Sequence, residues 1–370
     1  MKKFAFTADW HLAPCAWKRN KLGVGDSYDA LKFIVDYCVE HQLVLVAAGD
    51  LLDQTVQPDA KTVDVLCQNM SRMESAGLPV YYIQGQHEKS DPPWMSVHRW
   101  PKHVHASKLG NRFGTLAFDW QPRQVLKDVL AGVKDVKMLV MHQVWQEFVG
   151  FEHAYEASFS DIPDCVEYLL TGDHHKHSSE VYPRASGKPI RVLSPGSISA
   201  QELSEEWQKQ FFVVEDHSFQ SVTIPSRSIY RVRVTHSDQV SEVLNRIKKH
   251  KQHKIPILEV TVSPEFDNAF EYFDKFDKVH YELVLKYETS SQIETIIDRL
   301  KMPEVSEASD VDYLRAAVSE TSDIYPMASR MLMSESPSLE IAEIKKEFFG
   351  ETQERSAEEC VPISRRLRRV

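Results

Sequence analysis

Long apolar runs, paired cysteines and a basic charge excess are all missing from this 370-residue chain. The longest apolar run, Leu43–Ala48, has six residues, whereas a membrane-spanning helix needs about 20. The five cysteines are widely spaced and include no Cys-x-x-Cys pair, which argues against a disulfide framework or a zinc ribbon. No Gly-Lys-Ser or Gly-Lys-Thr sequence occurs, so we expect any use of ATP to come from another chain.

The charge balance is acidic. The 44 Lys and Arg residues against 54 Asp and Glu residues give a net charge of −10, so any contact with nucleic acid must use a local basic patch. Lys2 and Lys3 are followed by polar Asp9 and His11 before an apolar signal core could form. We therefore expect no export signal, no membrane association and a cytoplasmic location.

The order of apolar segments predicts a layered α/β domain over residues 1–225. Short apolar segments alternate with helical periodicity in the first half, and antiparallel strand-like segments follow. The predicted strands that precede polar motifs are Lys3–Thr7, Leu43–Ala48, Val80–Ile83, Lys137–Met141 and Tyr168–Thr171, and the predicted helices are Asp26–His41 and Pro58–Ala76. Residues 226–290 predict a small α+β domain, and residues 291–370 predict a helical region interrupted by prolines.

Five groups of potential metal ligands each follow one of these predicted strands. The groups are Asp9 with His11, Gly49–Asp53, Gly85–Glu88, His142, and Gly172–His175. The carboxyl ends of strands in layered α/β folds meet at one edge, so the five groups can converge on one place. Each group alone also fits an ordinary structural role, such as a helix cap at Asp53 or a buried, hydrogen-bonded His142.

The residue types in these groups suit two-metal hydrolysis of a phosphoester. Imidazole and carboxylate together favour Mn²⁺, Fe or Zn²⁺ over Mg²⁺, which prefers oxygen ligands. Two ions about 3.5–4 Å apart clamp the phosphoryl group and activate water, provided that one carboxylate lies between them. A further histidine that is not a ligand can protonate the leaving oxygen.

The series of motifs resembles that of the calcineurin-like metallophosphoesterase superfamily and, within it, the SbcD family of DNA repair nucleases in a compact form such as phages carry. Phe6–Leu12 is similar to the opening motif of that family, Tyr168–Lys176 to its closing motif, and Ser194–Ser197 with the acidic stretch after it to the following loop. The resemblance implies a layered β-sandwich flanked by helices, a small domain that caps the site and touches DNA, and a C-terminal region that docks on an ATPase.

The resemblance also implies a role for each motif residue. The first ion would be held by Asp9, His11 and His175, the second by Gln86, His142 and Asp173, and both by the bridging Asp50. His87 would protonate the leaving sugar oxygen. Two residues depart from the family pattern, because Gln86 replaces an asparagine and Asp173 replaces a histidine. An alternative frame of the closing motif would use His175 and His177 instead.

Together these features predict a DNA phosphodiesterase that uses two divalent ions, with Mn²⁺ preferred because of the hard Asp173 carboxylate and Mg²⁺ as the alternative. The resemblance implies the nuclease subunit of an SbcCD-like complex, with DNA, an SbcC-type ABC ATPase and a second copy of the chain as partners. It would work in the host cytoplasm if phage-encoded.

The basic stretch Arg246–Lys254 is either a solvated helix end or a set of phosphate contacts. Two other functions stay open for the whole chain. They are a stand-alone metallophosphatase acting on a small phosphoester, and a catalytically weak scaffold that binds metal poorly because of Gln86.

Overall fold

The computed structural model describes residues 3–17, 22–52, 58–88, 90, 92–109, 115–149, 155–215, 218–249, 254–263 and 282–287. The chain divides into two compact units, residues 1–261 with 268–286, and residues 262–267 with 287–370. The architecture below is that of the first unit. The predicted helical region 291–370 and Asp53 lie outside the described residues.

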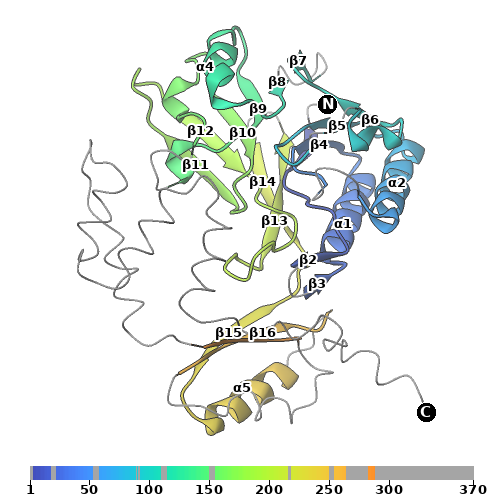
Figure 1. Cartoon of the computed structure of the whole chain (residues 1–370). Helices are drawn as coiled ribbons and strands as arrows, with labels where there is room; N and C mark the ends of the chain where they lie inside the picture. Colours follow the sequence, from blue (N-terminus) through green and yellow to red (C-terminus); the bar gives the residue numbers. More distant parts are fainter. Residues whose placement is uncertain are drawn as a thin grey trace, which may run out of the picture. The chain divides into compact units, whose positions relative to one another are not determined.

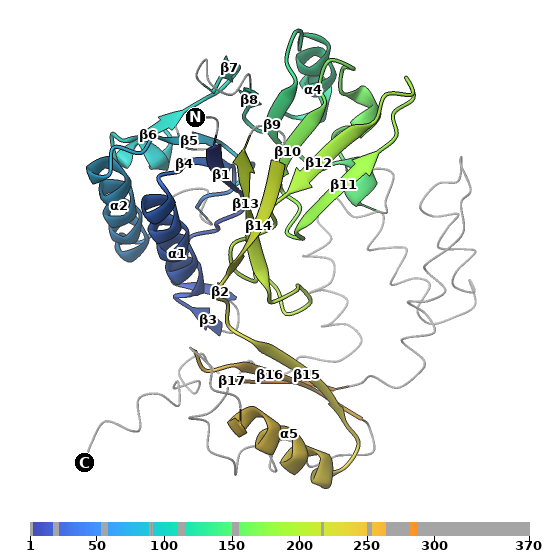
Figure 2. The same cartoon turned by 180° about the vertical axis from the view of Figure 1, so that it is seen from behind.

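Two six-stranded sheets form the centre of this unit (Figures 1 and 2). The first has the order β14-β13-β1-β4-β5-β6 and the second the order β11-β12-β10-β9-β8-β7. The strands of the first sheet are β1 (Lys3–Thr7), β4 (Val44–Ala48), β5 (Val80–Ile83), β6 (Pro101–His103), β13 (Lys209–Glu215) and β14 (Ser218–Ile224). Those of the second are β7 (Ser107–Lys108), β8 (Thr115–Phe118), β9 (Met138–His142), β10 (Tyr168–Gly172), β11 (Ser178–Tyr182) and β12 (Ile190–Ser194).

The strands that precede the polar motifs are all in parallel runs. β1, β4 and β5 pair in parallel in the first sheet, and β9 and β10 do so in the second. Antiparallel pairs occur at β13 with β1 and β14, and at the edge strands β11 and β7. The parallel strands therefore bring their carboxyl ends to a common edge in each sheet.

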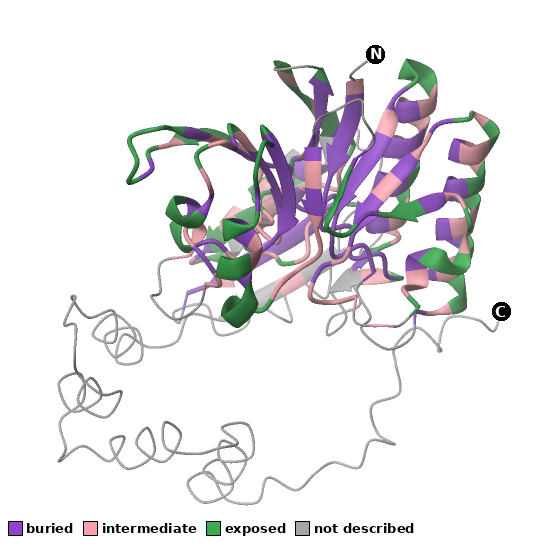
Figure 3. Cartoon of the chain, turned by 90° about the horizontal axis from the view of Figure 1, so that it is seen from above, coloured by how far each residue is buried: buried purple, intermediate pink, exposed green. Residues whose placement is uncertain are grey.

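Side-chain alternation along the strands builds four layers. On β4, Leu45 and Ala47 pack with helices α1 (Asp26–His41) and α2 (Ala60–Ser75), whereas Val46 and Ala48 pack against the second sheet. On the far side of the second sheet, helix α4 (Arg123–Ala131) buries Leu126 and Leu130. Figure 3 shows buried residues on the strands and on the inner faces of the helices. The predicted α/β class is confirmed.

The structure moves some predicted boundaries and adds elements. His142 is the last residue of β9 and Gly172 the last of β10, rather than the residues after them. The strand β8 and the helix α4 were not predicted, because a four-residue strand and a nine-residue helix carry little periodicity. The start of α4 is marked by Pro122, which has extended backbone and precedes its first turn.

A small module follows β14, the last strand of the first sheet in chain order. Strands β15 (Ile229–Val234), β16 (Ile257–Val262) and β17 (Glu282–Tyr287) form a three-stranded sheet, and helix α5 (Ser237–Lys249) lies beside it (Figure 2). A two-stranded ribbon of β2 (Cys15–Trp17) and β3 (Leu22–Val24) leads into α1. Strands β15 to β17 and helix α5 have the α+β character that the sequence predicts for residues 226–290.

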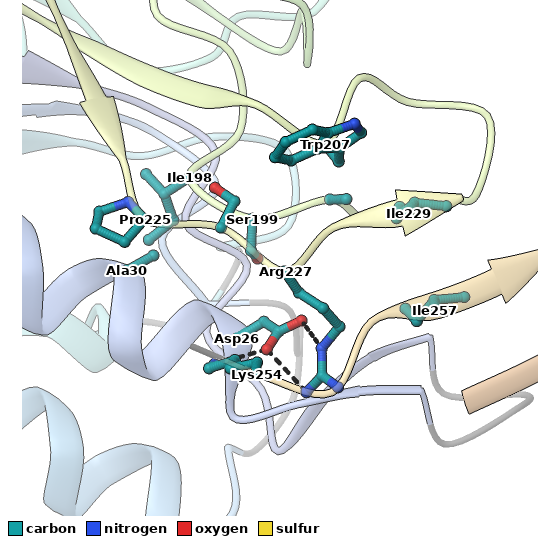
Figure 4. A pocket seen from close by; sticks show the side chains of 12 residues that line it. Asp26, Ala30, Ile198, Ser199, Trp207, Pro225, Arg227, Ile229, Lys254 and Ile257 are labelled. Atoms are coloured by element: carbon teal, nitrogen blue, oxygen red, sulfur yellow. Dashed lines mark hydrogen bonds and ion pairs between the residues drawn. The ribbon is translucent and has the colours of Figure 1, made fainter. Parts of the chain in front are cut away.

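A cluster of charges joins the module to α1 (Figure 4). The guanidinium of Arg227, in the connection between β14 and β15, donates to both oxygens of Asp26 at 2.8 and 3.1 Å. Lys254, in the connection that leads to β16, lies 2.7 Å from Asp26 and 2.5 Å from Asp29. The connection into the module and the connection between α5 and β16 thus meet on the first turn of α1, where acidic residues interact favourably with the helix dipole. Lys254 is therefore an ion-pair residue of this junction.

Two sequence-based expectations concern disulfide bonds and membrane-spanning helices. All four cysteines in the part of the chain that the structure describes, Cys15, Cys38, Cys67 and Cys165, are free thiols. None of the helices among the described residues combines the length and the apolar character that crossing a membrane would require.

Removing the Asp26 carboxylate should destabilise the junction. Its side chain is 13% exposed, and those of Arg227 and Lys254 are 8% and 18% exposed. Breaking such a buried pair costs about 3 kcal/mol, since the remaining charges lose their partner. We expect Asp26→Ala to lower the free energy of unfolding in urea by about that amount.

Asp36→Ala is the matched control on the same helix, because Asp36 is 40% exposed and also ion-paired. It should cost at most about 1 kcal/mol, and equal losses in both variants would contradict the junction's role.

Candidate metal centre

The loops after β1 and β4 are joined backbone to backbone. The amide of Asp9 donates to the carbonyl of Gly49 at 3.0 Å, and that of His11 donates to the carbonyl of Asp50 at 2.9 Å. The amide of Leu12 continues this pairing to Leu51 at 3.0 Å. The first two predicted motifs are therefore held in fixed register beyond the ends of their strands.

Four of the predicted site residues have left-handed backbone conformations. The φ angles are 50° for Asp9, 41° for His11, 49° for Asp50 and 78° for Asp173. Such angles are uncommon for residues with a Cβ and cost about 1–3 kcal/mol each. Their concentration at one place is typical of a functional site, where packing forces the backbone to present side chains in a set direction.

Glycines in three of the motifs make room for the site. A Cβ on Gly49 would lie 2.5 Å from His142 Nδ1, and one on Gly85 would lie 2.0 Å from Asp50 Oδ1. A Cβ on Gly172 would lie 2.2 Å from the Ala48 carbonyl and 2.5 Å from His142 Nδ1. Gly49 and Gly172 thus allow the close approach of the two sheets, and Gly85 leaves room for the Asp50 carboxylate.

Asp50 lies at the centre of the cluster. Its Oδ1 accepts the backbone amide of His87 at 3.0 Å. Its Oδ2 lies 3.3 Å from His142 Nε2, 3.7 Å from His87 Nε2 and 4.0 Å from His11 Nε2. Burial alone would raise the pKa of this carboxyl, but His142, His11 and His87 hold it below its usual range. One anionic oxygen is thus surrounded by three imidazoles.

Asp9, His11 and His175 form a second group of ligand atoms within reach of one ion. The Nε2 atoms of His11 and His175 are 3.1 Å apart. His175 Nδ1 lies 2.9 Å from the Glu205 carboxylate, which assigns the ring proton to Nδ1 and leaves Nε2 as the free ligand atom. The Asp9 carboxylate accepts the amide of Asp173 at 3.0 Å.

Asp9, Asp50 and His142 form another such group, with ligand atoms from both sheets. His142 is fully buried, its Nδ1 donates to the Ala48 carbonyl at 2.8 Å, and its Nε2 makes no hydrogen bond. Burial would lower the pKa of His142, yet Asp50, Asp9 and Asp173 raise it well above the usual value. Burial also raises the pKa of Asp9. The carboxylates thus create a negative potential that favours the binding of a cation.

The residues present fit a divalent metal ion. The open Nε2 of His142 and the close Nε2 pair of His11 and His175 are lone-pair donors aimed at shared space. Both His142 and His175 have their other nitrogen engaged by an acceptor, as metal-ligating histidines do. Mixed imidazole and carboxylate donors suit Mn²⁺, Fe²⁺ or Zn²⁺.

Gln86 and Asp173 lie together at the side of this group. The Gln86 amide donates to Asp173 Oδ1, and Asp173 Oδ1 lies 3.8 Å from His142 Nε2. The other amide atom of Gln86, Oε1, is buried without a hydrogen bond. Because the two amide atoms are interchangeable by rotation, Gln86 can present oxygen to either side. Both residues lie beside His142, and neither belongs to the groups of possible ligand atoms among the described residues.

His87 is the most open histidine near Asp50. Its side chain is 38% exposed, against 6% for His11 and 0% for His142. Its ring stands edge-on to that of His11, with centroids 5.2 Å apart. His87 also forms a possible ligand group with His11 and Asp50. The geometry therefore allows two roles, proton donor to a bound molecule or third ligand.

The alternative frame of the closing motif does not reach the cluster. His177 Nδ1 lies 3.2 Å from the Pro195 carbonyl and its Nε2 lies 2.8 Å from Ser221 Oγ. The His177 ring stacks on Phe212 with centroids 4.3 Å apart. Among the described residues, the possible ligand groups include His175 and not His177, and the frame with Asp173 and His175 stays the prediction.

Sequence reasoning missed two supporting carboxylates. Glu88 accepts the amides of Leu51 and Leu52 at 2.6 and 3.1 Å and that of Gly85 at 3.0 Å. It thereby ties the second motif to the third, and burial with the nearby Asp50 charge raises its pKa to about 7. Its place in the Gly85–Glu88 motif was the available signal.

Glu205 supports His175 from the loop after β12. Its second oxygen accepts Lys209 Nζ at 2.6 Å and Ser197 Oγ at 3.0 Å. Burial would raise the pKa of Glu205, but His175 and Lys209 bring it to about 2. The acidic stretch after Ser194–Ser197 was visible in the sequence, but the buried partner Lys209 at a strand start was not.

No family model matches the chain. Among named proteins, the DNA double-strand break repair protein Mre11 of Sulfurisphaera tokodaii is 22% identical over 269 residues, covering 64% of this chain and 67% of that protein. Mre11 of Archaeoglobus fulgidus is 25% identical over 287 residues, covering 63% of this chain and 61% of the relative. The uncharacterized metallophosphoesterase YhaO of Bacillus subtilis is 22% identical over 207 residues, covering 51% and 49%.

The chain thus spans about half to two thirds of the length of these relatives. Among solved structures, TT1561 of Thermus thermophilus overlaps 60% of the chain with a TM-score of 0.37 and 11% identity. A dimetal phosphatase from Danio rerio overlaps 60% with a TM-score of 0.34 and 11% identity. By sequence, the chain is similar at low identity to metallophosphoesterases that include Mre11 proteins.

Gly172→Ala should disrupt the metal centre. The added methyl would meet the Ala48 carbonyl and the His142 ring, both in the core, so His142 must move from Asp50. We expect Mn²⁺ binding, measured by isothermal titration, to fall at least about tenfold. Gly132→Ala is the control, since its nearest atom would be the Val129 carbonyl at 3.3 Å. Unchanged Mn²⁺ affinity in Gly172→Ala would contradict the assigned role of His142.

Proposed function

We propose that this chain is a metal-dependent phosphodiesterase that cleaves DNA. The observation that carries the proposal is the buried Asp50 carboxylate with three imidazoles within 4.0 Å, at the edge where both sheets end. Support for DNA as the substrate comes from the Mre11 relatives, which are named as DNA double-strand break repair proteins.

The proposed ligand sets follow the two groups of atoms. Asp9, His11 and His175 would hold one ion, and His142 with Asp173 and Gln86 would hold the other. Asp50 lies between the groups, with Oδ2 facing both His11 and His142. When bound, two divalent ions would polarise the phosphoester and lower the pKa of water. We propose Mn²⁺ as the working ion, because a carboxylate at Asp173 is a harder ligand than the histidine of the family pattern.

His87 is the proposed acid for the leaving oxygen. Its backbone amide is fixed by Asp50, while its ring is the most solvent-accessible of the three imidazoles around Asp50. An imidazole placed in this way can hold a proton at Nε2 and transfer it to a sugar oxygen as the phosphorus–oxygen bond breaks. Asp9, Asp50 and the buried histidines lack this access and would hold the ions instead.

The finer assignments are proposals as well. We propose a nuclease subunit of an SbcCD-like complex, phage-type, that works in the host cytoplasm with an SbcC-type ATPase and a second copy of itself. The domain division would be 1–225 for the nuclease, 226–290 for the cap and 291–370 for partner docking. Within the basic stretch, Lys254 already pairs with Asp26, so phosphate contacts would fall to other residues of Arg246–Lys254.

Asp50→Asn should abolish cleavage of end-labelled linear duplex DNA in Mn²⁺ by the purified chain. The substitution keeps the shape but removes the charge between the two ligand groups, so both ions lose a shared ligand. Asp64→Asn is the matched control, since Asp64 is 51% exposed on α2. Cleavage by the wild-type chain that persists in Asp50→Asn would contradict the proposal.

This assay also separates the alternative functions. Metal bound without DNA cleavage, but with hydrolysis of a chromogenic phosphodiester, would point to a small phosphoester as substrate. Absence of stoichiometric metal after Mn²⁺ loading, by elemental analysis, would point to a scaffold. Metal bound with neither activity would call for repetition with an ATPase partner.

His87→Gln should retain both metal ions and lose DNA cleavage by about 10²–10⁴-fold, the usual contribution of a general acid. Glutamine keeps the fold of the loop, because the backbone amide still reaches Asp50. Metal content is measured by elemental analysis and rates by single-turnover cleavage. Loss of one ion from the variant would make His87 a ligand, the other role that the geometry allows.

A further inference from the structure

The loop between β12 and β13 contacts the metal centre directly. The amide of Ser197 donates to the His175 carbonyl and the amide of Ile198 to the Asp9 carbonyl, each at 3.3 Å. Farther along the loop, the Glu205 carboxylate lies 2.9 Å from His175 Nδ1. The loop therefore fixes both the backbone and the ring of His175.

Two neighbouring side chains also hold the Glu205 carboxylate in place. Its other oxygen accepts Lys209 Nζ and Ser197 Oγ, and Lys209 Nζ also donates to Ser197 Oγ at 2.9 Å. Lys209 is 4% exposed, so its ammonium group is shielded from solvent within this network. The orientation of the His175 ring thus depends on where the main chain of the loop places Glu205.

The small module holds that main chain. Arg231, on β15, donates from its guanidinium to the carbonyl of Glu205 at 2.7 Å and to the carbonyl of Leu203. The same guanidinium lies 3.3 Å from Glu259 on β16, which orients it. The Arg231 guanidinium of the module therefore donates hydrogen bonds to two carbonyls of the loop that supports the candidate metal centre.

Apolar contacts accompany this polar one. Ile229 and Ile257, the first residues of β15 and β16, form a cluster with Leu203 and Trp207 of the loop. Figure 4 shows Trp207 and these two isoleucines around the same cavity. The loop is thus packed against the module at both ends of the segment that carries Glu205.

We propose that Arg231 is a positioning residue through which the small module sets the orientation of the ligand His175. The path runs from the Arg231 guanidinium to the Glu205 main chain, then through the Glu205 carboxylate to His175 Nδ1. The inference rests on the proposed metal role of His175. Through Arg231, the module would affect ion binding at His175 without contacting His175 itself.

The test uses Mn²⁺ binding in the absence of DNA, which excludes any direct contact of Arg231 with a substrate phosphate. Free Mn²⁺ is measured by electron paramagnetic resonance during titration of the full chain. Glu205→Gln should weaken the affected site by about 10–100-fold, the usual effect of losing a partner of a ligating histidine. Arg231→Met keeps the apolar stem and removes the donors, and it should weaken the same site by a few-fold to about tenfold.

A double-mutant cycle distinguishes positioning from general damage. If Arg231 acts through Glu205, Arg231→Met should add little in the Glu205→Gln background, whereas independent effects would add. Arg231→Lys, which retains the charge but cannot grip two carbonyls in the same way, should bind Mn²⁺ between wild type and Arg231→Met. Arg99→Met is the control, since Arg99 is 86% exposed and pairs with Glu74.

The outcomes separate this inference from the proposed function. Wild-type Mn²⁺ affinity in Arg231→Met, or full additivity in the cycle, would overturn the positioning role and leave the nuclease proposal intact. A wild-type chain that binds no Mn²⁺, or an Asp50→Asn chain that binds it equally, would instead overturn the proposed function. Weaker binding in Arg231→Met without additivity would support the inference.

Discussion

The mutual repulsion of buried carboxylates around Asp50 is the constraint on which the rest of the site depends. Asp9, Asp50 and Asp173 come from three different strand ends, and their charges raise the pKa of the fully buried His142. Such a group is unfavourable unless positive charge is present, supplied here by imidazoles and in the proposed enzyme by metal ions. The left-handed backbone at four predicted site residues adds strain that the packed sheets maintain.

Most of the fold and the site could be predicted, because strand ends are marked by local sequence. The apolar segments before Asp9, Asp50 and Gln86 are short and buried on both faces, and each is followed at once by polar residues. The helix at Asp26–His41 has the predicted bounds, since its buried residues follow a clear helical period. The roles of individual ligands stay predictions, although the structure brings all eight predicted residues together.

What could not be predicted depends on contacts between distant segments. Glu205 stands in an acidic stretch visible in the sequence, but its pairing with His175, 30 residues away in the chain, and with the buried Lys209 carries no periodic or motif signal. The choice between His175 and His177 likewise depends on the pairing of β11 with β12, which turns His177 toward Ser221. The electrostatic role of Lys254 became visible only from its contact with Asp26 on α1, 228 residues away.

The candidate ligands come from both sheets, which has a consequence for the order of folding and metal binding. His11 and His175, whose Nε2 atoms are 3.1 Å apart, are separated by 164 residues of chain. An ion can therefore bind tightly only after the two sheets have packed against each other, unlike the metal of a zinc finger, which organises a short chain. The ion cannot guide the first steps of folding. In the proposed enzyme, a bound ion would hold the two sheets together at their shared edge and add its binding free energy to the stability of the folded domain.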